Sequence, residues 1–316
     1  MFVFFLLKLD LSSYVEVLKR ASLPWLASSL FFFCLQIVVR AFRLIWIFDS
    51  GRVGIKQALV IQNLHVPLIN TLPAGLGDAS LLYLLKRVAG VNFGAGAGCY
   101  LVLRTVEFSL CLLMFLALTV SGPGISGITG EWLTRSKIIA VVILIGVVAF
   151  YFLLLSARFE NLIDSLKNRD FPRWARWVIH FIGDIHDQIK HSLGSRGFIR
   201  VVMYTAVFYI FVFLNLYSVF RSLNAGLTLG NVFFFYVLIF PFLVIPIKGP
   251  MNVGTFEFSW VVLLVLLGVG KQQAVVLAFA GHTIALLNVL VSFLLFGLVV
   301  LVTILIRGGK RLRAGA

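Results

Sequence analysis

The sequence is poor in charged residues, and acidic residues are the scarcest of them. Only 12% of the 316 residues are charged, and Asp and Glu together number 12, whereas roughly a quarter of an ordinary soluble domain is charged. Apolar runs recur from Leu23 to Ile306, and no polar stretch between them reaches the roughly 50 residues that a separate domain needs. This excludes a soluble globular protein and predicts one membrane domain over residues 1–316.

Several catalytic and ligand-binding motifs are also missing. The sequence contains no nucleotide-binding loop, no zinc-ligand spacing and no nucleophile elbow. The run Gly94–Gly98 lacks the preceding strand and the following lysine of a phosphate loop, so it is interpreted as a helix start rich in small residues. The three cysteines lie in apolar surroundings and are interpreted as buried hydrophobic residues. We therefore expect no metal and no cofactor.

What the sequence has in excess is positive charge. The net charge is +15, but the basic residues lie between and after the apolar runs rather than on one soluble face. This distribution is typical of the positive-inside rule and does not indicate nucleic acid. The most basic segments, 157–199 and the tail 307–316, are therefore expected in the cytoplasm, with the C-terminus on that side.

Five apolar segments are long enough to cross a hydrocarbon core of about 30 Å, which takes about 20 residues. They are residues 24–47, 99–120, 138–156, 200–220 and 274–306. The last is overlong, so we expect it to tilt or to kink near Gly281. Residues 1–9 are too short to cross, and they are either an interfacial helix or the remainder of a clipped first helix.

Four further apolar pieces are too short or too broken to be ordinary spans. They are residues 57–72, 79–85, 230–247 and 256–267. Proline and glycine separate the members of each pair, at Pro73–Asp78 and at Pro246–Gly254, and both residue types end helices. Broken backbone at membrane depth is tolerated only where protein or water satisfies its polar groups. We therefore predict two re-entrant hairpins.

The two predicted hairpins resemble each other and have opposite topologies. The basic loops place the entrance of the first on the cytoplasmic side and that of the second outside. An acidic residue follows each break, Asp78 or Glu257, and Arg104 and His282 follow the two breaks at nearly equal distances. The predicted fold is an all-α polytopic bundle of two inverted repeats, a layout of secondary transporters. The repeats are about residues 24–156 and 200–306.

Ionisable side chains inside these apolar segments are the candidates for a site, because each costs at least about 2.5–3.5 kcal/mol at the membrane centre. Arg104 and Glu107 share one helix face. They either pair to hold helices together, or Arg104 binds a phosphate or carboxylate headgroup while Glu107 orients it. Lys248 either attracts an anion near the helix ends or extends to the outer surface.

The remaining candidates also have two interpretations. Asp78 and Glu257 each either cap a half-helix or neutralise a cation. His65 and His282 either make one hydrogen bond or move a proton. The amides in the apolar runs, Asn70, Asn252 and Asn288, are interpreted as hydrogen-bonding groups between helices. The candidate substrate-binding residues are Arg104, Glu107, Lys248, Glu257, Asp78, His282 and Asn70.

The segment between the predicted repeats has its own pattern. Aromatic and aliphatic residues recur at helical spacing after Pro172, with Arg and Lys between them. The pattern predicts an amphipathic helix that lies on the membrane and contacts anionic lipid.

Together these motifs resemble the flippase-like membrane domain that lysylphosphatidylglycerol synthases share with a group of archaeal dolichol-linked glycosyltransferases. The resemblance runs through most of the chain. It rests on Asn70–Asp78 with Leu84–Arg87, on Arg104 and Glu107, and on Pro246–Glu257. The family often has glutamate at Asp78 and arginine at His282, so the charge is kept at the first position and becomes dependent on pH at the second.

In the synthases, the resemblance implies, this domain moves an aminoacylated phospholipid between leaflets after a soluble domain has made it. It also implies the cytoplasmic membrane of a bacterium or archaeon. No soluble domain follows Ala316 in the sequence, so we expect the lipid to be made elsewhere.

The leading hypothesis is a translocase, not an enzyme, for an anionic or zwitterionic phospholipid or lipid-linked headgroup. One alternative is a scaffold that recruits a lipid-modifying or glycosyl-transferring enzyme through residues 157–199. The other is an intramembrane enzyme that uses Glu107 or Asp78 with His282 as acid and base, although no nucleophile accompanies them.

Overall fold

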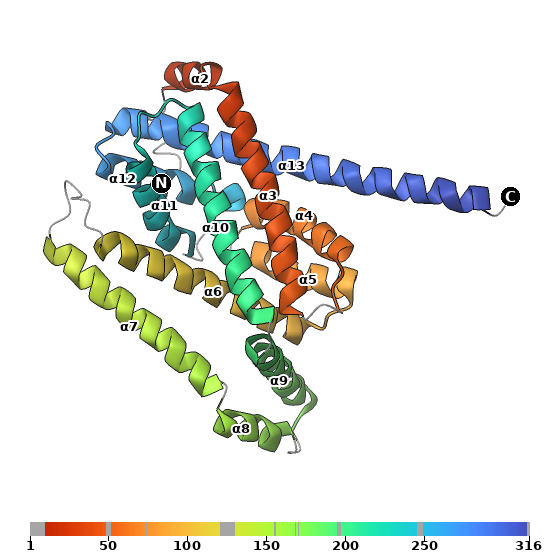
Figure 1. Cartoon of the computed structure of the whole chain (residues 1–316). Helices are drawn as coiled ribbons and strands as arrows, with labels where there is room; N and C mark the ends of the chain where they lie inside the picture. Colours follow the sequence, from red (N-terminus) through yellow and green to blue (C-terminus); the bar gives the residue numbers. More distant parts are fainter. Residues whose placement is uncertain are drawn as a thin grey trace. The chain divides into compact units, whose positions relative to one another are not determined.

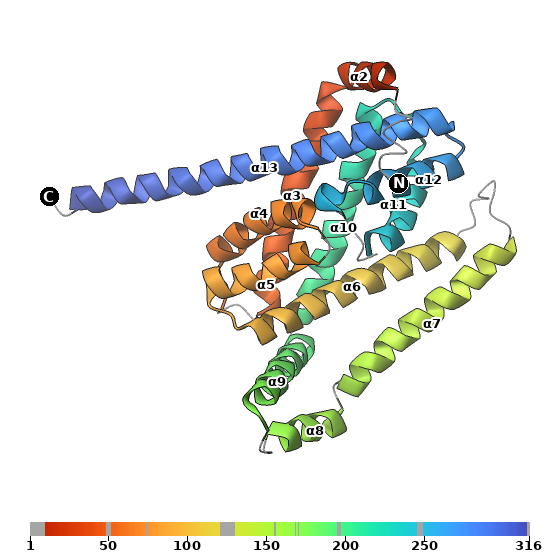
Figure 2. The ribbon, with the colours of Figure 1, turned by 180° about the vertical axis from the view of Figure 1, so that it is seen from behind.

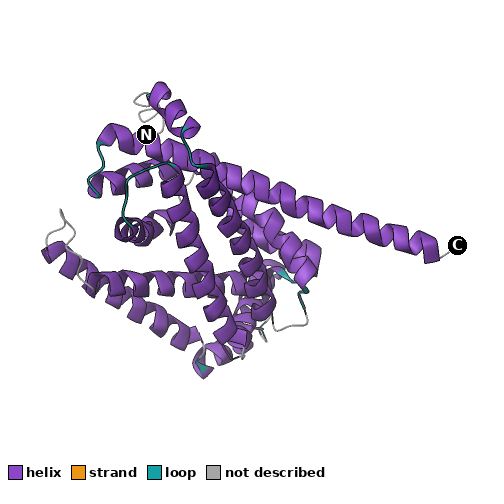
Figure 3. Cartoon of the chain, turned by 45° about the horizontal axis from the view of Figure 1, so that its top comes forward, coloured by secondary structure: helices purple, strands orange, loops and turns teal. Residues whose placement is uncertain are grey.

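The computed structural model is helical, and the residues that it describes contain no strand (Figure 3). It describes residues 10–48, 52–73, 75–120, 130–154, 156–167, 169, 171–194, 197–244 and 249–314. The predicted all-α membrane class is confirmed. The α-helices, labelled in Figure 1, are α2 Leu11–Lys19, α3 Leu23–Ile47, α4 Ile55–Thr71, α5 Leu76–Ala89, α6 Phe93–Val120, α7 Gly130–Leu154, α8 Ala157–Lys167, α9 Arg173–Gly194, α10 Gly197–Ser222, α11 Leu229–Val244, α12 Thr255–Leu266 and α13 Lys271–Ala314. A short 3-10 turn, η1 Pro250–Asn252, precedes α12.

Five of the described helices are long and apolar enough to cross a membrane. Their apolar parts are Leu23–Ile47, Phe93–Thr119, Lys137–Leu154, Gly197–Ser222 and Lys271–Leu298, and they correspond to the five spans predicted from the sequence. α13 is one continuous helix through Gly281 (Figure 2). A side chain at Gly281 would overlap the ring of Trp260, so this glycine allows close packing between α12 and α13.

The predicted interruptions are present between shorter helices. α4 and α5 have 17 and 14 residues, and α11 and α12 have 16 and 12. All are shorter than the roughly 20 residues that cross a bilayer upright. The re-entrant path, the opposite topologies and the inverted repeat remain predictions.

The chain forms two compact units. The first contains residues 1–41, 55–80 and 208–316, and the second contains residues 42–54 and 81–207. The core of the first unit is aromatic: Trp260 of α12 lies with its ring centroid 4.9 Å from that of Phe220 and 5.0 Å from that of Phe235. In the same unit α2 packs on α13, where Tyr14 and Thr283 share a hydrogen bond of 2.9 Å. α4 contacts both α13 and η1.

The second unit is held together by α6 and α9. Gly94 and Gly98 open α6, as the sequence predicts, and they face α9 rather than a ligand. A Cβ atom at Gly98 would lie 2.8 Å from the carbonyl oxygen of Ile185, which leaves no room for a side chain. α9 also caps the end of α3, because the amide of Gln188 donates to the carbonyl oxygen of Ile47 at 3.1 Å.

α9 differs in one respect from the helix predicted at the membrane surface. Its second half is packed into the unit, and the buried residues are Gly183, His186, Gln188, Ile189 and Ser192. Its first turns expose apolar side chains, with Trp174 at 72% and Trp177 at 65% exposure. The amphipathic pattern therefore combines a face that packs on α6 with an end that remains open to lipid or water.

Gly98→Ala is expected to destabilise the protein by about 1–3 kcal/mol, because the new methyl group overpacks the α6–α9 contact. Gly146→Ala is the matched control, since Gly146 of α7 has open space around its Cα. There alanine is expected to be neutral or stabilising by about 0.5–1 kcal/mol. Unfolding curves in detergent check this, and equal midpoints for the two variants would contradict the close contact.

Candidate functional site

The second break is organised by Glu257, the third residue of α12. Its residue exposure is 1%. Carboxylate oxygen Oε2 accepts a hydrogen bond of 2.6 Å from the backbone N–H of Gly254, which precedes the helix. Glu257 therefore caps its own half-helix. Gly254 has φ of 88°, a left-handed conformation that favours glycine.

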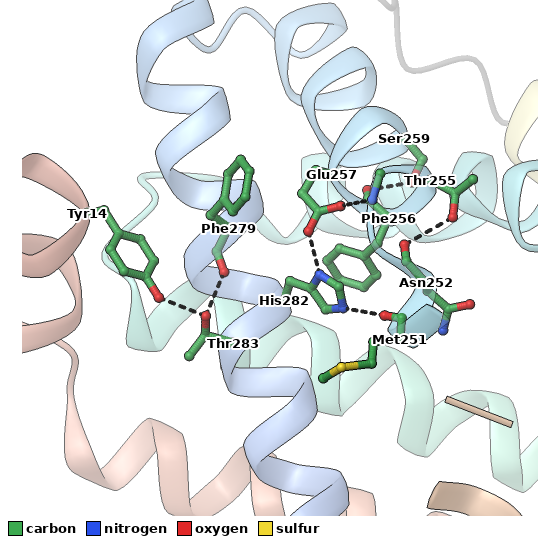
Figure 4. Close-up of polar contacts among 11 residues, drawn as sticks. Tyr14, Met251, Asn252, Thr255, Phe256, Glu257, Ser259, Phe279, His282 and Thr283 are labelled. Atoms are coloured by element: carbon green, nitrogen blue, oxygen red, sulfur yellow. Dashed lines mark hydrogen bonds and ion pairs between the residues drawn. The ribbon is translucent and has the colours of Figure 1, made fainter. Parts of the chain in front are cut away.

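The same carboxylate joins α12 to α13 through a histidine. Oε1 lies 2.6 Å from Nδ1 of His282, and the other ring nitrogen, Nε2, lies 3.0 Å from the carbonyl oxygen of Met251 (Figure 4). The ring of Phe256 stacks on the imidazole, with centroids 4.3 Å apart. The imidazole is thus held between a carboxylate, a backbone carbonyl and an aromatic ring.

These partners fix how many protons the Glu257–His282 pair holds. A backbone carbonyl only accepts, so Nε2 carries a hydrogen and donates it to Met251. The contact between Nδ1 and Oε1 needs one more proton, on either atom. In both placements the pair has no net charge, as imidazolium with carboxylate or as two neutral groups. This neutrality explains how two titratable side chains are accommodated inside an apolar bundle.

The backbone between the half-helices is strained and is held in place by these side chains. Met251 and Asn252 have φ of 57° and 58°, left-handed values that cost a non-glycine residue about 1–3 kcal/mol each. His282 donates to the carbonyl oxygen of Met251, and the hydroxyl of Thr255 donates to the carbonyl oxygen of Asn252 at 3.0 Å. Hydrogen bonds from α12 and α13 therefore maintain a conformation that the local sequence does not favour.

The first hairpin contains a related contact between a histidine and a serine. Nδ1 of His65, on α4, lies 2.9 Å from the hydroxyl of Ser80, on α5. That hydroxyl donates to the carbonyl oxygen of Gly77 at 2.6 Å, so the hydrogen between histidine and serine comes from His65. Ser80 follows Gly77 by three residues, just as Glu257 follows Gly254.

Two other candidates also lie in the first hairpin. Asp78 lies in the first turn of α5 and is partly buried. The amide of Asn70 donates to the carbonyl oxygen of Val66 at 2.7 Å, within the same helix. By contrast, the amide of Asn288 on α13 reaches the hydroxyl of Ser29 on α3 at 2.7 Å, and this bond between helices agrees with the interpretation of the sequence.

A second polar cluster lies in the unit of α6. Glu107 receives a hydrogen bond at each carboxylate oxygen, from Arg104 at 3.0 Å and from Arg43 at 2.6 Å. Arg104 also donates from Nε to the hydroxyl of Tyr100 at 3.0 Å. The Arg43 side chain is 3% exposed and that of Arg104 is 43% exposed. The cluster therefore has a buried arginine, a central glutamate and an arginine at the surface.

Sequence reasoning missed Arg43. It lies inside the predicted span 24–47, where the cost of a charge at depth applies to it as it does to Arg104. The i, i+3 spacing of Arg104 and Glu107 offered a partner for the glutamate within its own helix. The second partner of Glu107 becomes visible only in the structure, where Arg43 on α3 lies beside Glu107 on α6.

The seven candidate residues thus form two separate groups. Arg104 and Glu107 belong to the unit of residues 42–54 and 81–207, while the other described candidates belong to the first unit. Those are Asp78, Asn70, Glu257 and His282. Lys248 lies outside the described residues. A single substrate site formed by all seven remains a prediction.

Replacing one member of the Glu257–His282 pair by leucine is expected to cost about 3–5 kcal/mol, since it leaves a buried polar partner. Glu257→Leu with His282→Leu should cost clearly less than the sum of the two single changes, because neither partner is then stranded. Unfolding of all four proteins in mixed detergent micelles measures this coupling, and additive effects would contradict the pairing.

The chain was also compared with known proteins. A family model described as the lysylphosphatidylglycerol synthase TM region matches residues 1–297, a range that contains both polar clusters. No curated protein and no solved structure matches the chain. The match and the helices long enough to span a membrane support an integral membrane protein with a function related to membrane lipids. The chain belongs to the family of the lysylphosphatidylglycerol synthase TM region.

Proposed function

We propose that the protein translocates a phospholipid or lipid-linked molecule with an anionic or zwitterionic headgroup across the cytoplasmic membrane. The observation that carries the proposal is the cluster of Arg43, Glu107 and Arg104. A charged cluster on membrane-spanning helices is costly, and such residues usually mark substrate or ion pathways. Family membership agrees with a lipid-related role.

Within the cluster the two arginines have different tasks. Arg43 is buried and bonds Glu107 directly, so it offsets the charge of the glutamate and fixes its position. Arg104 is bonded to the same glutamate and is 43% exposed. A guanidinium presents a planar set of donors that matches phosphate or carboxylate oxygens. Arg104 is therefore the residue that meets the headgroup, and Glu107 orients it.

The broken helices offer further polar groups for a headgroup. Two short helices, α4 and α11, end at the two breaks and two others, α5 and α12, begin there, and within the first unit α4 contacts η1 at the second break. Ends of half-helices offer backbone N–H and C=O groups to a polar substrate inside the membrane. The headgroup would pass along these groups while the acyl chains stay in lipid.

A scaffold remains the second candidate because of one observation, the exposed start of α9. Trp174 and Trp177 are largely exposed and lie beside Arg173 and Arg176. Aromatic and arginine side chains are common anchors in protein interfaces. Affinity capture on this end of α9 tests the scaffold, and a reproducible lipid-modifying or glycosyl-transferring enzyme without lipid transport by the purified protein would favour it.

Arg104→Ala is expected to slow headgroup-selective translocation by about ten- to a hundredfold, since a hydrogen bond to a charged group contributes about 1.5–3 kcal/mol. The measurement uses proteoliposomes with fluorescent phospholipids of different headgroup charge, quenched from outside by dithionite. Arg221→Ala, at the end of α10 and outside both clusters, is the matched control and should behave as the original protein. Normal translocation by folded Arg104→Ala would refute the proposed site.

Arg43→Ala is expected to act mainly on folding. Its removal takes the donor from the buried Oε1 of Glu107, while Oε2 keeps Arg104, and the loss of this hydrogen bond to a charged group costs about 1.5–3 kcal/mol. The yield of monodisperse protein should fall for Arg43→Ala and stay normal for Arg104→Ala, as size-exclusion chromatography in detergent can show. The reverse order would contradict the roles assigned to the two arginines.

A further inference from the structure

We propose that the Glu257–His282 pair is the proton-binding site that couples translocation to a proton gradient. The transport step rests on the proposed function, whereas the proton site rests on its own geometry. The pair lies at a helix break and joins two helices, α12 and α13, with its side chains almost fully buried. A group that binds a transported proton needs both features: a titratable centre and a link to a movable segment.

The number of ring protons decides how many contacts His282 can keep. Nδ1 lies 2.6 Å from Oε1 of Glu257 and Nε2 lies 3.0 Å from the carbonyl oxygen of Met251. When the pair loses one proton, the imidazole has a single N–H for these two acceptors. A hydrogen bond to a carboxylate is stronger than one to a neutral carbonyl, so the remaining hydrogen stays on Nδ1. Protonation therefore decides whether His282 on α13 donates to Met251.

The loss of this hydrogen bond affects the second break. Met251 then has no donor from Nε2 of His282, and the left-handed conformations of Met251 and Asn252 are no longer held by α13. The backbone between the half-helices is then free to change. A proton at His282 thus controls the shape of the second break.

The helices packed against the pair carry other titratable groups. On the described parts of α2, α4, α11, α12 and α13 they are Tyr14, Glu16, Lys19, Lys56, His65, Tyr236 and Lys271. α10, which packs on α12 through Phe220, adds Tyr209, Tyr217 and Arg221, and the last two lie against the ring of Trp25. Three of the buried or half-buried ones are bonded elsewhere: Tyr14 to Thr283, His65 to Ser80, and Tyr236 to the carbonyl oxygen of Tyr209.

Most of the others lie far from the pair along their helices. Lys56 lies at the start of α4 and Lys271 at the start of α13, three turns from His282. Glu16 forms an exposed ion pair with Arg20. In this packing the titratable partner of His282 is Glu257.

The proton balance of the cycle is simple. The deprotonated pair, with carboxylate and neutral imidazole, has a charge of −1 and binds one proton from water on one side of the membrane. The resulting neutral pair is occluded and holds the break in the conformation described above. When the proton leaves to water on the other side, the break is released and changes shape before the next proton binds. The neutral form is the one that suits the apolar interior, because it carries no net charge through it.

The test uses a variant that keeps the contacts and cannot release a proton. His282→Arg retains positive charge opposite Glu257 and donors for the carbonyl oxygen of Met251, and a guanidinium stays protonated at all working pH values. His65→Gln is the matched control, because His65 is also a buried histidine at a helix break and glutamine keeps a donor for the hydroxyl of Ser80. Each protein is reconstituted with fluorescent phospholipids, with and without a pH gradient of one unit.

One pH unit corresponds to a factor of about ten in proton activity, so a process that moves one proton changes by up to about tenfold. The original protein and His65→Gln should show translocation rates that depend on the gradient. His282→Arg should translocate lipid at a rate that the gradient does not change. Translocation by the original protein that ignores the gradient would overturn the coupling and leave the proposed function intact. Equal loss of the dependence in His65→Gln would overturn the assignment to this pair.

A second measurement separates the proton site from transport. Hydrogen–deuterium exchange at residues 249–258, corrected for the intrinsic effect of pH, should increase as pH rises in the original protein and stay unchanged in His282→Arg. If no lipid moves and this change is present, the proposed function fails and the proton site stands. If the exchange of the original protein is independent of pH, the proton site is wrong whatever the transport assay gives.

Discussion

The neutralisation of buried charge is the constraint on which the structure depends. A bilayer offers no water to a carboxylate or a guanidinium, so every such group needs a partner from another part of the chain. Glu107 finds two arginines, and Glu257 finds a histidine and the N-terminus of its own helix. The Arg43–Glu107 and Glu257–His282 pairs join different helices, and in this way the rare acidic residues determine tertiary contacts.

The two clusters solve the same electrostatic problem with different consequences. Arginine stays protonated, so the ion pairs of Glu107 are permanent and suit a fixed platform for a headgroup. A histidine ring can carry one proton or two, so the hydrogen bond from His282 to Met251 is conditional. Met251 and Asn252 form the strained backbone that this bond holds. The ion pairs of Glu107, which do not depend on pH, and the hydrogen bonds of His282, which do, thus lie in different compact units.

The sequence predicted the helices better than their contacts. Length and hydropathy identified the five spans, and proline and glycine identified both breaks, because these features are local. The partner of Glu107 was missed, since Arg43 is far away in sequence and only packing reveals it. His282 and Glu257 were chosen separately from their cost at depth, but the 2.6 Å contact between them depends on the close approach of α12 and α13 at Gly281 and Trp260.

The small residues at the start of α6 have a consequence for the segment between the two predicted repeats. α9 is pressed against α6 at Gly94 and Gly98, and its Gln188 is bonded to the end of α3 at Ile47. α3 carries Arg43 and α6 carries Glu107 and Arg104, so α9 acts as a brace across the two helices of the charged cluster. A displacement of α9 would therefore change the distance between Arg43 on α3 and Arg104 on α6. A partner that binds this connecting segment could alter the charged cluster in this way.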